Sequence, residues 1–510
     1  MLRQPSDGYA FPDNLMKPPV MGIGDSMYNG MRSATIRAEF AAKAPPALVG
    51  RLLAPEGGFR HPAYPEPLLI DVEALARELS IGDLATLLRA RLRAARDNAL
   101  RWADGRHVVR AEHAAWDNIA QAGAEIPDVI THDVAHWRAE VARFRPKIAA
   151  IDDLSTLPGE IVDIHMALNA LFLFNPNARP ELEGLRPIDI AAARKPRNLL
   201  MNLGSNHGII DITLRGGVDS GLKGLRQWAE DMAELAALLT EFGPETERFY
   251  ISTVPLPSTV PNIMPPYNVD VSIEPLLRKD GYYPVYDNRL GGPDDYIRFT
   301  AKEMKYLDGE VTAINNRMAA VMRRVFARAG DDRLRIVRLD RLLKKYDGKH
   351  DPSRKITRDT PGARLEFDRR RYANLAYSPS ALPFSGGFKE GGLCGLDQHH
   401  PSGLGYSLYA RELARMLAAD GEPIKLHRMP ISEQGDRLFS EGPVKYELLV
   451  SILYDLRRRR AGLSSPPTLE EMKGETTIPP AIPTPPPLSG EEKAAGDLMR
   501  VMDSVMGRRR

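Results

Sequence analysis

Short apolar runs that alternate with long helical patterns predict an α/β protein, in which parallel strands form a sheet with helices on both faces. Four runs have the length and composition of buried strands, and a glycine or a proline closes each of the first three. Because helical stretches separate consecutive strands, we expect right-handed crossovers between them. The four runs occupy residues 20–23, 198–203, 248–254 and 334–339.

The long helical patterns lie between these strands. Residues 71–103 are rich in Ala, Leu and Arg at helical spacing, and residues 222–242 and 299–329 have the clearest amphipathic patterns. No internal repeat of about 20–50 residues stands out, which argues against a solenoid or a propeller. The sequence therefore predicts one helix-rich domain built around a parallel sheet.

Composition and charge exclude several classes of protein. Of the 510 residues, 43% are hydrophobic and 27% are charged, which excludes a wholly disordered, collagenous or coiled-coil chain. The net charge of +2 gives no reason to expect nucleic acid as a partner. The single cysteine, Cys394, excludes an internal disulfide and a cysteine-based metal site.

The N-terminus and the hydropathy pattern predict a cytoplasmic protein. The first residues lack the apolar stretch of a secretory signal, and no run of about 18 apolar residues could span a membrane. A single cysteine also fits a reducing compartment. No feature of the sequence indicates an oligomeric state.

The last fifty residues differ from the rest of the chain. Residues 461–490 carry eight prolines and are predicted to form an extended linker. Residues 491–510 follow as a short amphipathic helix that ends in three arginines, and residues 457–460 are also arginines. Such runs allow a weak contact with a membrane surface, although most are solvated helix ends. Apolar residues of this helix recur at helical spacing at Leu498, Val501, Met502, Val505 and Met506.

A serine stands where the first predicted strand ends, in the segment Gly24-Asp25-Ser26. A serine at a tight turn from strand to helix exposes its Oγ above the sheet and has its own N–H at a helix N-terminus. That placement suits a nucleophile and one oxyanion donor. The alternative is a helix cap, in which Asp25 or Ser26 accepts backbone N–H groups.

A second candidate motif begins at Asp397. An acid three residues before His400 can hold the imidazole by its Nδ1–H, which leaves Nε2 free to take a proton from a serine. Pro401 is then expected in the first turn of a helix. Here too the alternative is a helix start, with Asp397 as its cap and the histidines in solvent.

Four segments in order resemble the conserved blocks of the GDSL, or SGNH, hydrolases, and the phospholipase B-like and lipase-like members resemble the chain most. Residues 24–30 are similar to the first block and residues 396–406 to the last. Residues 117–124 are similar to the second block and residues 203–208 to the third. The resemblance implies the flavodoxin-like three-layer α/β/α sandwich of that family, enlarged by helical and loop insertions.

The resemblance also implies a role for each site residue. Ser26 is the nucleophile, His400 is the general base and then the general acid, and Asp397 orients the imidazole. The N–H groups of Ser26 and Gly123 and the side-chain amide of Asn206 form the oxyanion hole. The chemistry is acyl transfer through an acyl-enzyme, and it requires no metal and no cofactor.

The chain departs from the family pattern in two ways. His207 stands where the third block usually has an aspartate, which puts the placement of Asn206 in doubt. The spacings between blocks are long, so a hydrolase domain of residues 1–460 is expected to contain insertions near 40–110, 130–195 and 344–395. Residues 351–395 read as a long excursion of the kind that often forms a lid.

Neighbouring residues allow other interpretations. His399 is one position too early for the step from acid to base, so we expect it beside the site or in solvent. A metal site made of His207, Asp397, His399 and His400 is conceivable, but nothing in the sequence indicates tetrahedral geometry. Cys394 is expected to be a small buried residue, and no base is assigned to its thiol, so we do not expect it to be a nucleophile.

The favoured function is that of a serine carboxylic-ester hydrolase acting on lipid or other acyl esters. A carbohydrate O-acetyl esterase is the alternative within this class. A catalytically idle member of the family, used as a binding or scaffold module, is the alternative from another class. Ser26, Asp397 and His400 argue against an idle module, which has no chemical reason to keep all three.

Overall fold

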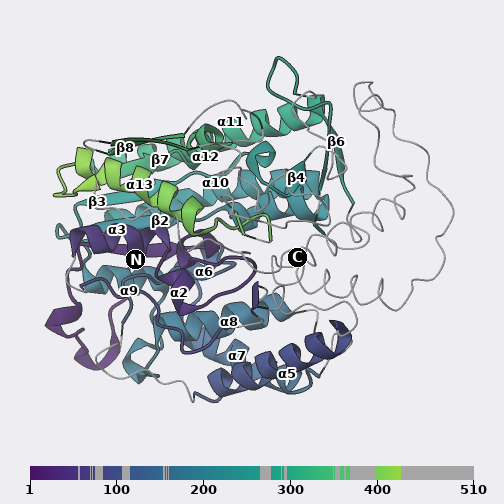
Figure 1. Ribbon diagram of the computed structural model, residues 1–510. Coiled ribbons are helices and arrows are strands. Elements are labelled where there is room, and N and C mark those ends of the chain that lie inside the picture. The colour runs from purple at the N-terminus through teal and green to yellow at the C-terminus, as the bar shows by residue number, and fades with distance from the viewer. Residues whose placement is uncertain are drawn as a thin grey trace.

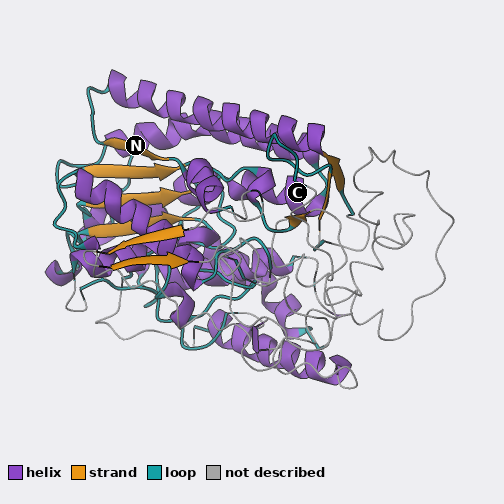
Figure 2. Ribbon diagram, turned by 45° about the horizontal axis from the view of Figure 1, so that its top comes forward, coloured by secondary structure: helices purple, strands orange, loops and turns teal. Residues whose placement is uncertain are grey.

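The sheet at the centre of the protein confirms the α/β class. In the computed structural model, strands β1 (Val20–Gly24), β2 (Asn198–Asn202), β3 (Arg248–Ser252) and β7 (Leu334–Val337) pair in parallel in the order β1-β2-β3-β7. The four predicted strands are confirmed, each within two residues of its observed ends. Figure 2 shows these arrows pointing the same way. The structure describes residues 1–54, 58–68, 71, 73–74, 84–105, 115–152, 156, 158, 160–264, 277–288, 290–291, 296–347, 350, 356–360, 363–367, 394–395 and 397–426.

An extended segment outside the named strands continues the sheet beyond β1. Residues 117–121 run parallel to β1: Gly22 N–H donates to the carbonyl of Asp117, and Ile119 N–H donates to the carbonyl of Gly22, both at 2.8 Å. Gln121 N–H donates to the carbonyl of Gly24, also at 2.8 Å. From one edge to the other, the order is therefore 117–121, β1, β2, β3, β7.

Side chains that alternate along the strands enter two apolar clusters, one on each face of the sheet. Met21, Leu199 and Phe249 lie in one cluster, and Val20, Leu200 and Tyr250 lie in the other. Both faces of the sheet are buried, which explains why the strand sequences are continuous apolar runs.

Helices cover both faces of the sheet (Figure 1). Buried residues of α10 (Val218–Thr240) and α11 (Ala301–Arg328), which pack along each other, belong to the first cluster. Helices α3 (Pro45–Leu53), α12 (Leu339–Tyr346) and α13 (Gly403–Ala419) contribute to the second, and α3 lies against α13. Helices α10 and α11 confirm the patterns predicted at 222–242 and 299–329. Thr300 and Glu303 begin α11 as a capping box.

A group of three helices packs beside this core (Figure 1). Helices α5 (Leu84–Ala103), α7 (Val134–Ala149) and α8 (Ile161–Phe174) contact one another. Helix α5 confirms the C-terminal part of the helix predicted at 71–103. Helix α8 is apolar on nearly all sides, and twelve of its fourteen residues are buried, so it is a core helix.

The remaining elements are short, and several were not predicted. Strands β4 (Ile263–Met264), β5 (Val285–Asn288) and β6 (Arg298–Thr300) form an antiparallel sheet, and β8 (Ile356–Thr360) and β9 (Ala363–Phe367) form a hairpin inside the excursion 351–395. The prolines and the linker at 461–490 and the helix at 491–510 lie outside the described residues. Short helical elements are α1 (Ser26–Asn29), α2 (Ala38–Ala41), α6 (Ile126–Ile130), α9 (Pro187–Arg194), the 3-10 turns Ser6–Gly8, Asp13–Leu15, Pro180–Leu182, Ser205–His207 and Pro257–Thr259, and the π-helical turn Asp211–Arg215.

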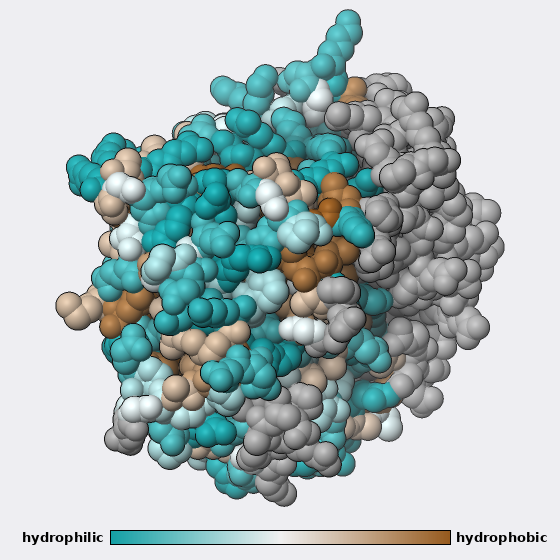
Figure 3. Space-filling view, turned by 90° about the vertical axis from the view of Figure 1, so that its left-hand side faces the viewer, coloured by the Kyte–Doolittle hydropathy of each residue, from teal (hydrophilic) through white to brown (hydrophobic). Residues whose placement is uncertain are grey.

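The described surface is largely polar. Figure 3 shows mainly hydrophilic residues on one face of the molecule, with small apolar areas between them. Among the described residues, the large hydrophobic side chains that stand exposed are Met1 and Tyr306. No helix in the described part of the chain has the length and apolar character that a membrane span requires.

Candidate active site

The turn after β1 presents Ser26 at the start of a short helix. Gly24 has φ +148°, and a Cβ at this position would lie 2.1 Å from the carbonyl oxygen of Asn202, so the turn requires glycine. Asp25 caps α1, because its carboxylate accepts the N–H of Met27 at 3.0 Å. The cap interpretation is therefore right for Asp25. The Ser26 side chain instead contacts His400.

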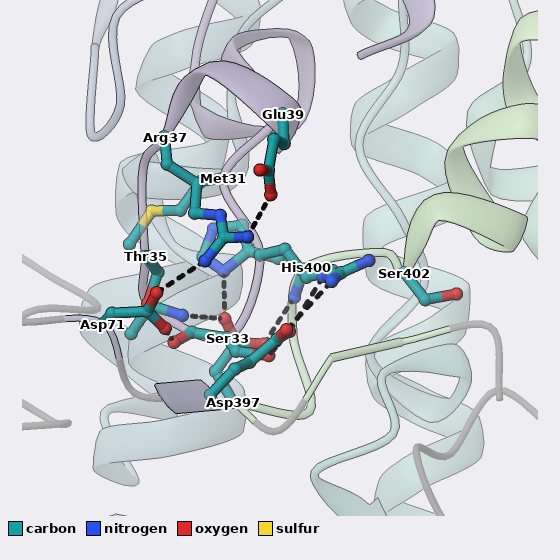
Figure 4. Close-up of polar contacts among 12 residues, drawn as sticks. Met31, Ser33, Thr35, Arg37, Glu39, Asp71, Asp397, His400 and Ser402 are labelled. Atoms are coloured by element: carbon teal, nitrogen blue, oxygen red, sulfur yellow. Dashed lines mark hydrogen bonds and ion pairs between the residues drawn. The ribbon is translucent and has the colours of Figure 1, made fainter. Parts of the chain in front are cut away.

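Ser26, His400 and Asp397 form a continuous hydrogen-bonded relay. Nε2 of His400 lies 2.8 Å from Oγ of Ser26, and Nδ1 of His400 lies 2.7 Å from Oδ2 of Asp397. Ser26 is 7% exposed and His400 is 6% exposed, so both retain a small accessible surface while Asp397 has none. Figure 4 shows the His400 and Asp397 side chains directed toward each other. The sequence motif predicted this pairing.

Four N–H groups hold Asp397 in place as a carboxylate. Its Oδ1 accepts the backbone N–H groups of His399 at 3.0 Å and His400 at 2.9 Å. Its Oδ2 accepts Nδ1–H of His400 and, at 2.7 Å, the backbone N–H of Ala34. Burial alone would raise the pKa of Asp397, but the interactions with His400 and the backbone N–H groups outweigh it and lower the pKa to about 2.

Sequence reasoning missed the loop that supplies Ala34. Ser33 and Ala34 both have positive φ angles, 52° and 55°, which non-glycine residues adopt at an energetic cost. A buried bidentate ion pair from Arg32 to Glu73, at 2.8 and 2.9 Å, holds this loop, and Ser33 Oγ donates to the same carboxylate at 2.7 Å. No motif links position 73 to position 32, so the sequence carries no signal for this support.

The turn at 121–124 leaves one backbone N–H without an acceptor in the described structure. Gln121 N–H is bonded to Gly24, Ala122 N–H donates to Oδ1 of Asn169 at 3.0 Å, and Ala124 N–H donates to the carbonyl of Gln121 at 3.1 Å. Between them, Gly123 N–H has no acceptor among the described residues, and neither has the N–H of Ser26. Gly123 has φ +79°, so this turn favours glycine.

Asn206 lies against the Gly123 turn. It belongs to the 3-10 turn after β2, and its Nδ2 donates to the carbonyl of Ala124 at 3.1 Å. A primary amide has two N–H groups, so this bond leaves one for another acceptor. His207, the next residue, accepts the N–H of Ile126 at 3.5 Å through Nε2. Both residues thus connect the turn at 205–207 to the segment that follows Gly123.

The sequence also predicts the surroundings of His399, Cys394 and Pro401. His399 is partly buried beside the site, where its Nε2 contacts Thr213 Oγ1 at 3.1 Å and burial lowers its pKa to about 4. Cys394 is buried, as expected. The prediction that Pro401 lies in the first turn of a helix is wrong: Ser402 caps α13, and Pro401 pairs with Cys394 in an isolated β-bridge, because the chain here still runs beside residues 394–395.

The chain has no match among protein-family models, curated proteins or solved structures. In the described part of the chain, no group of three or more His, Cys, Asp or Glu side chains is placed to hold a metal ion.

Asp25 is expected to make the stability of the protein depend on pH. Burial raises its pKa from 3.8 to about 7, and its Oδ2 has no hydrogen-bond partner among the described residues. Since the pKa is higher in the folded than in the unfolded chain, the neutral carboxyl stabilises the fold below about pH 4. This contribution is lost as the pH rises to about 7.

The substitution Asp25→Asn, which cannot ionise, should therefore become more stable relative to wild type between pH 4 and pH 8. We expect the difference in unfolding free energy to grow by about 2–4 kcal/mol over this range, since one pKa unit corresponds to about 1.4 kcal/mol. Urea unfolding at several pH values measures it. A difference that stays constant with pH would show that Asp25 ionises in the folded protein as it does in solvent.

Proposed function

We propose that this protein is a serine carboxylic-ester hydrolase of the SGNH type, which acts on lipid or other acyl esters through an acyl-enzyme. The observation that carries the proposal is the buried relay from Ser26 Oγ through His400 to Asp397, with distances of 2.8 and 2.7 Å. Such a relay turns a weakly nucleophilic hydroxyl into one whose proton has an acceptor in place.

The order of the sheet supports the same proposal. With segment 117–121 counted as a strand, the strands follow the order 2-1-3-4-5 in the chain, which is the flavodoxin-like order. The relay and the turns at 121–124 and 205–207 then lie at the carboxyl ends of neighbouring strands, where open α/β sheets bind ligands. The helices on both faces fit the three-layer sandwich of SGNH hydrolases.

The proposed reaction begins with attack of Ser26 Oγ on the ester carbonyl carbon while its proton passes to Nε2 of His400. The negative charge that develops on the carbonyl oxygen is stabilised by the N–H groups of Ser26 and Gly123 and by the Asn206 amide. His400 then gives its proton to the departing alcohol, which leaves an acyl group on Ser26. Water, deprotonated by His400, releases the acid and restores the serine.

Asp397 keeps His400 in the tautomer that this sequence needs. An ionised carboxylate at Nδ1 requires a proton there, so Nε2 of the neutral ring is free to accept from Ser26. The same charge stabilises the imidazolium formed after proton transfer. Because the pKa of Asp397 is low, its carboxylate is ionised throughout the neutral pH range, so it can fix the tautomer of His400 and stabilise the imidazolium.

Covalent labelling by a fluorophosphonate tests the proposal directly. The probe should attach to Ser26 in the native protein, as located by mass spectrometry of peptides. Prior heat denaturation should abolish the labelling, because an unactivated serine reacts very slowly. The Ser220→Ala variant, which lacks an exposed serine of α10, should label as wild type does.

Turnover on a panel of short-acyl, long-acyl and acetylated-sugar esters then separates a lipid esterase from a carbohydrate O-acetyl esterase. A folded wild type that neither labels at Ser26 nor hydrolyses any of these esters would contradict the proposal. It would favour the alternative of a catalytically idle binding or scaffold module.

A further inference from the structure

Helix α8 lies outside the four family-like segments, yet it supports the turn that carries Gly123. The backbone carbonyl of Met166 accepts Nε2–H of Gln121 at 3.2 Å, and the side chain of Met166 fills the space beside Gly123. A Cβ on Gly123 would lie 2.8 Å from the Met166 sulfur. The turn therefore has close contact with α8 on both sides of Ala122.

Asn169 of α8 makes the most direct of these contacts. Its side chain is completely buried, and Oδ1 accepts the N–H of Ala122 at 3.0 Å. Its Nδ2 donates to the hydroxyl of Tyr64 at 2.9 Å. A buried amide whose oxygen and nitrogen both have partners is held in a single orientation.

The same amide is linked to the helix that carries the nucleophile. Asn29, the last residue of α1, donates through Nδ2 to the carbonyl of Ala120 at 2.7 Å and to the hydroxyl of Tyr64 at 3.1 Å. Asn29 and Tyr64 are buried as well. The network of Asn29, Tyr64 and Asn169 thus connects α1, the Gly123 turn and α8.

This network fixes the direction of the Gly123 N–H. The peptide plane that contains this N–H lies between two planes whose N–H groups are already bonded, those of Ala122 and Ala124. If the bond from Ala122 to Asn169 is lost, one of the two bonds that hold the peptide plane of Gly123 is missing, and this plane can rotate. An N–H that rotates away no longer points to a developing negative charge.

We propose that Asn169 is a positioning residue for the oxyanion donor Gly123, an inference that rests on the proposed hydrolase function. It stabilises the transition state by holding the turn in place, without itself contacting substrate. Tyr64 and Asn169 both lie in segments interpreted from the sequence as insertions. These segments therefore contribute to the reaction as well as to the shape of the protein.

The test compares steady-state kinetics with the affinity for a trifluoromethyl ketone. Ser26 Oγ adds to the ketone carbon while its proton moves to His400, which creates a tetrahedral oxyanion like that of the reaction. In Asn169→Leu we expect kcat to fall about 10–100-fold with KM nearly unchanged. The inhibition constant of the ketone should rise by the same factor as kcat/KM falls. Asn169→Asp, which keeps the acceptor for Ala122, should recover most of the loss.

Asn198→Leu is the matched control. Asn198 is also a buried asparagine, but it is the first residue of β2, at the end of the strand away from the site. It should lower stability but leave kcat and the inhibition constant unchanged. If Asn169→Leu does not fold, Asn169→Ser decides the same question. Wild-type kinetics and ketone affinity in a folded Asn169→Leu variant, or in Asn169→Ser if Asn169→Leu does not fold, would overturn this inference alone. An inactive wild type would overturn the proposed function and this inference with it.

Discussion

Replacing Ser26 with alanine is expected to lower kcat for ester hydrolysis by about 10⁴–10⁶-fold, and His400→Ala should have a similar effect. In the proposed reaction Oγ of Ser26 is the nucleophile, and the His400 imidazole at 2.8 Å accepts its proton. Because the two residues act as one unit in the proposed reaction, the double variant Ser26→Ala/His400→Ala should be no slower than either single variant. Initial rates with a chromogenic medium-chain ester measure all three.

Two controls make this result specific. His136→Ala, which removes a partly exposed histidine of α7, should keep wild-type kcat. Circular dichroism should show that the two single variants retain the fold. Independent, multiplicative losses in the double variant would contradict the relay, because they would mean that Ser26 and His400 act in separate steps.

The second large effect is on stability, and it concerns Arg194 at the end of α9. Arg194→Met is expected to lower the free energy of unfolding by about 3–5 kcal/mol, the range typical of a broken buried ion pair. The guanidinium and the Asp117 carboxylate it contacts are both completely buried. Arg194 also donates to the backbone carbonyls of Leu15 and Trp116. Urea unfolding at pH 7 measures the loss.

Lys195→Met is the matched control at the next position. Lys195 pairs with Glu245 at 3.0 Å, but both side chains are partly exposed, so the loss should be under about 1 kcal/mol. Equal effects of the two substitutions would show that Arg60 alone is enough to stabilise the Asp117 carboxylate. The backbone N–H of Arg60 donates to this carboxylate at 2.7 Å.

The parallel sheet could be predicted because its strands are buried on both faces and therefore read as short apolar runs. The antiparallel strands β4, β5 and β6 have two to four residues each and include polar positions such as Asp287 and Asn288, so they give no comparable signal. Segment 117–121 lies within the block-like run 117–124, but its sequence does not predict that it joins the sheet. Its polar residues Asp117, Asn118 and Gln121 are bonded to buried groups that only the fold brings near.

The motifs predicted the relay residues, since an acid and a histidine three positions apart, and a serine after a strand, are local patterns. The supporting residues are not local. Ala34 contacts Asp397 across 363 residues, and Asn169 contacts Ala122 across 47. Nothing in the sequence near either residue distinguishes it from its neighbours, so such contacts require the structure.

The separation of Ser26 from His400 has a consequence for how the protein is made. The two residues are 374 positions apart. At a synthesis rate of roughly 5–20 residues per second, the serine leaves the ribosome on the order of 20–75 s before its base exists. The β1 turn can form early, but the relay closes only when the segment before α13 docks beside it. On our proposal, a nascent chain, or one truncated before His400, carries the serine without the imidazole that would accept its proton.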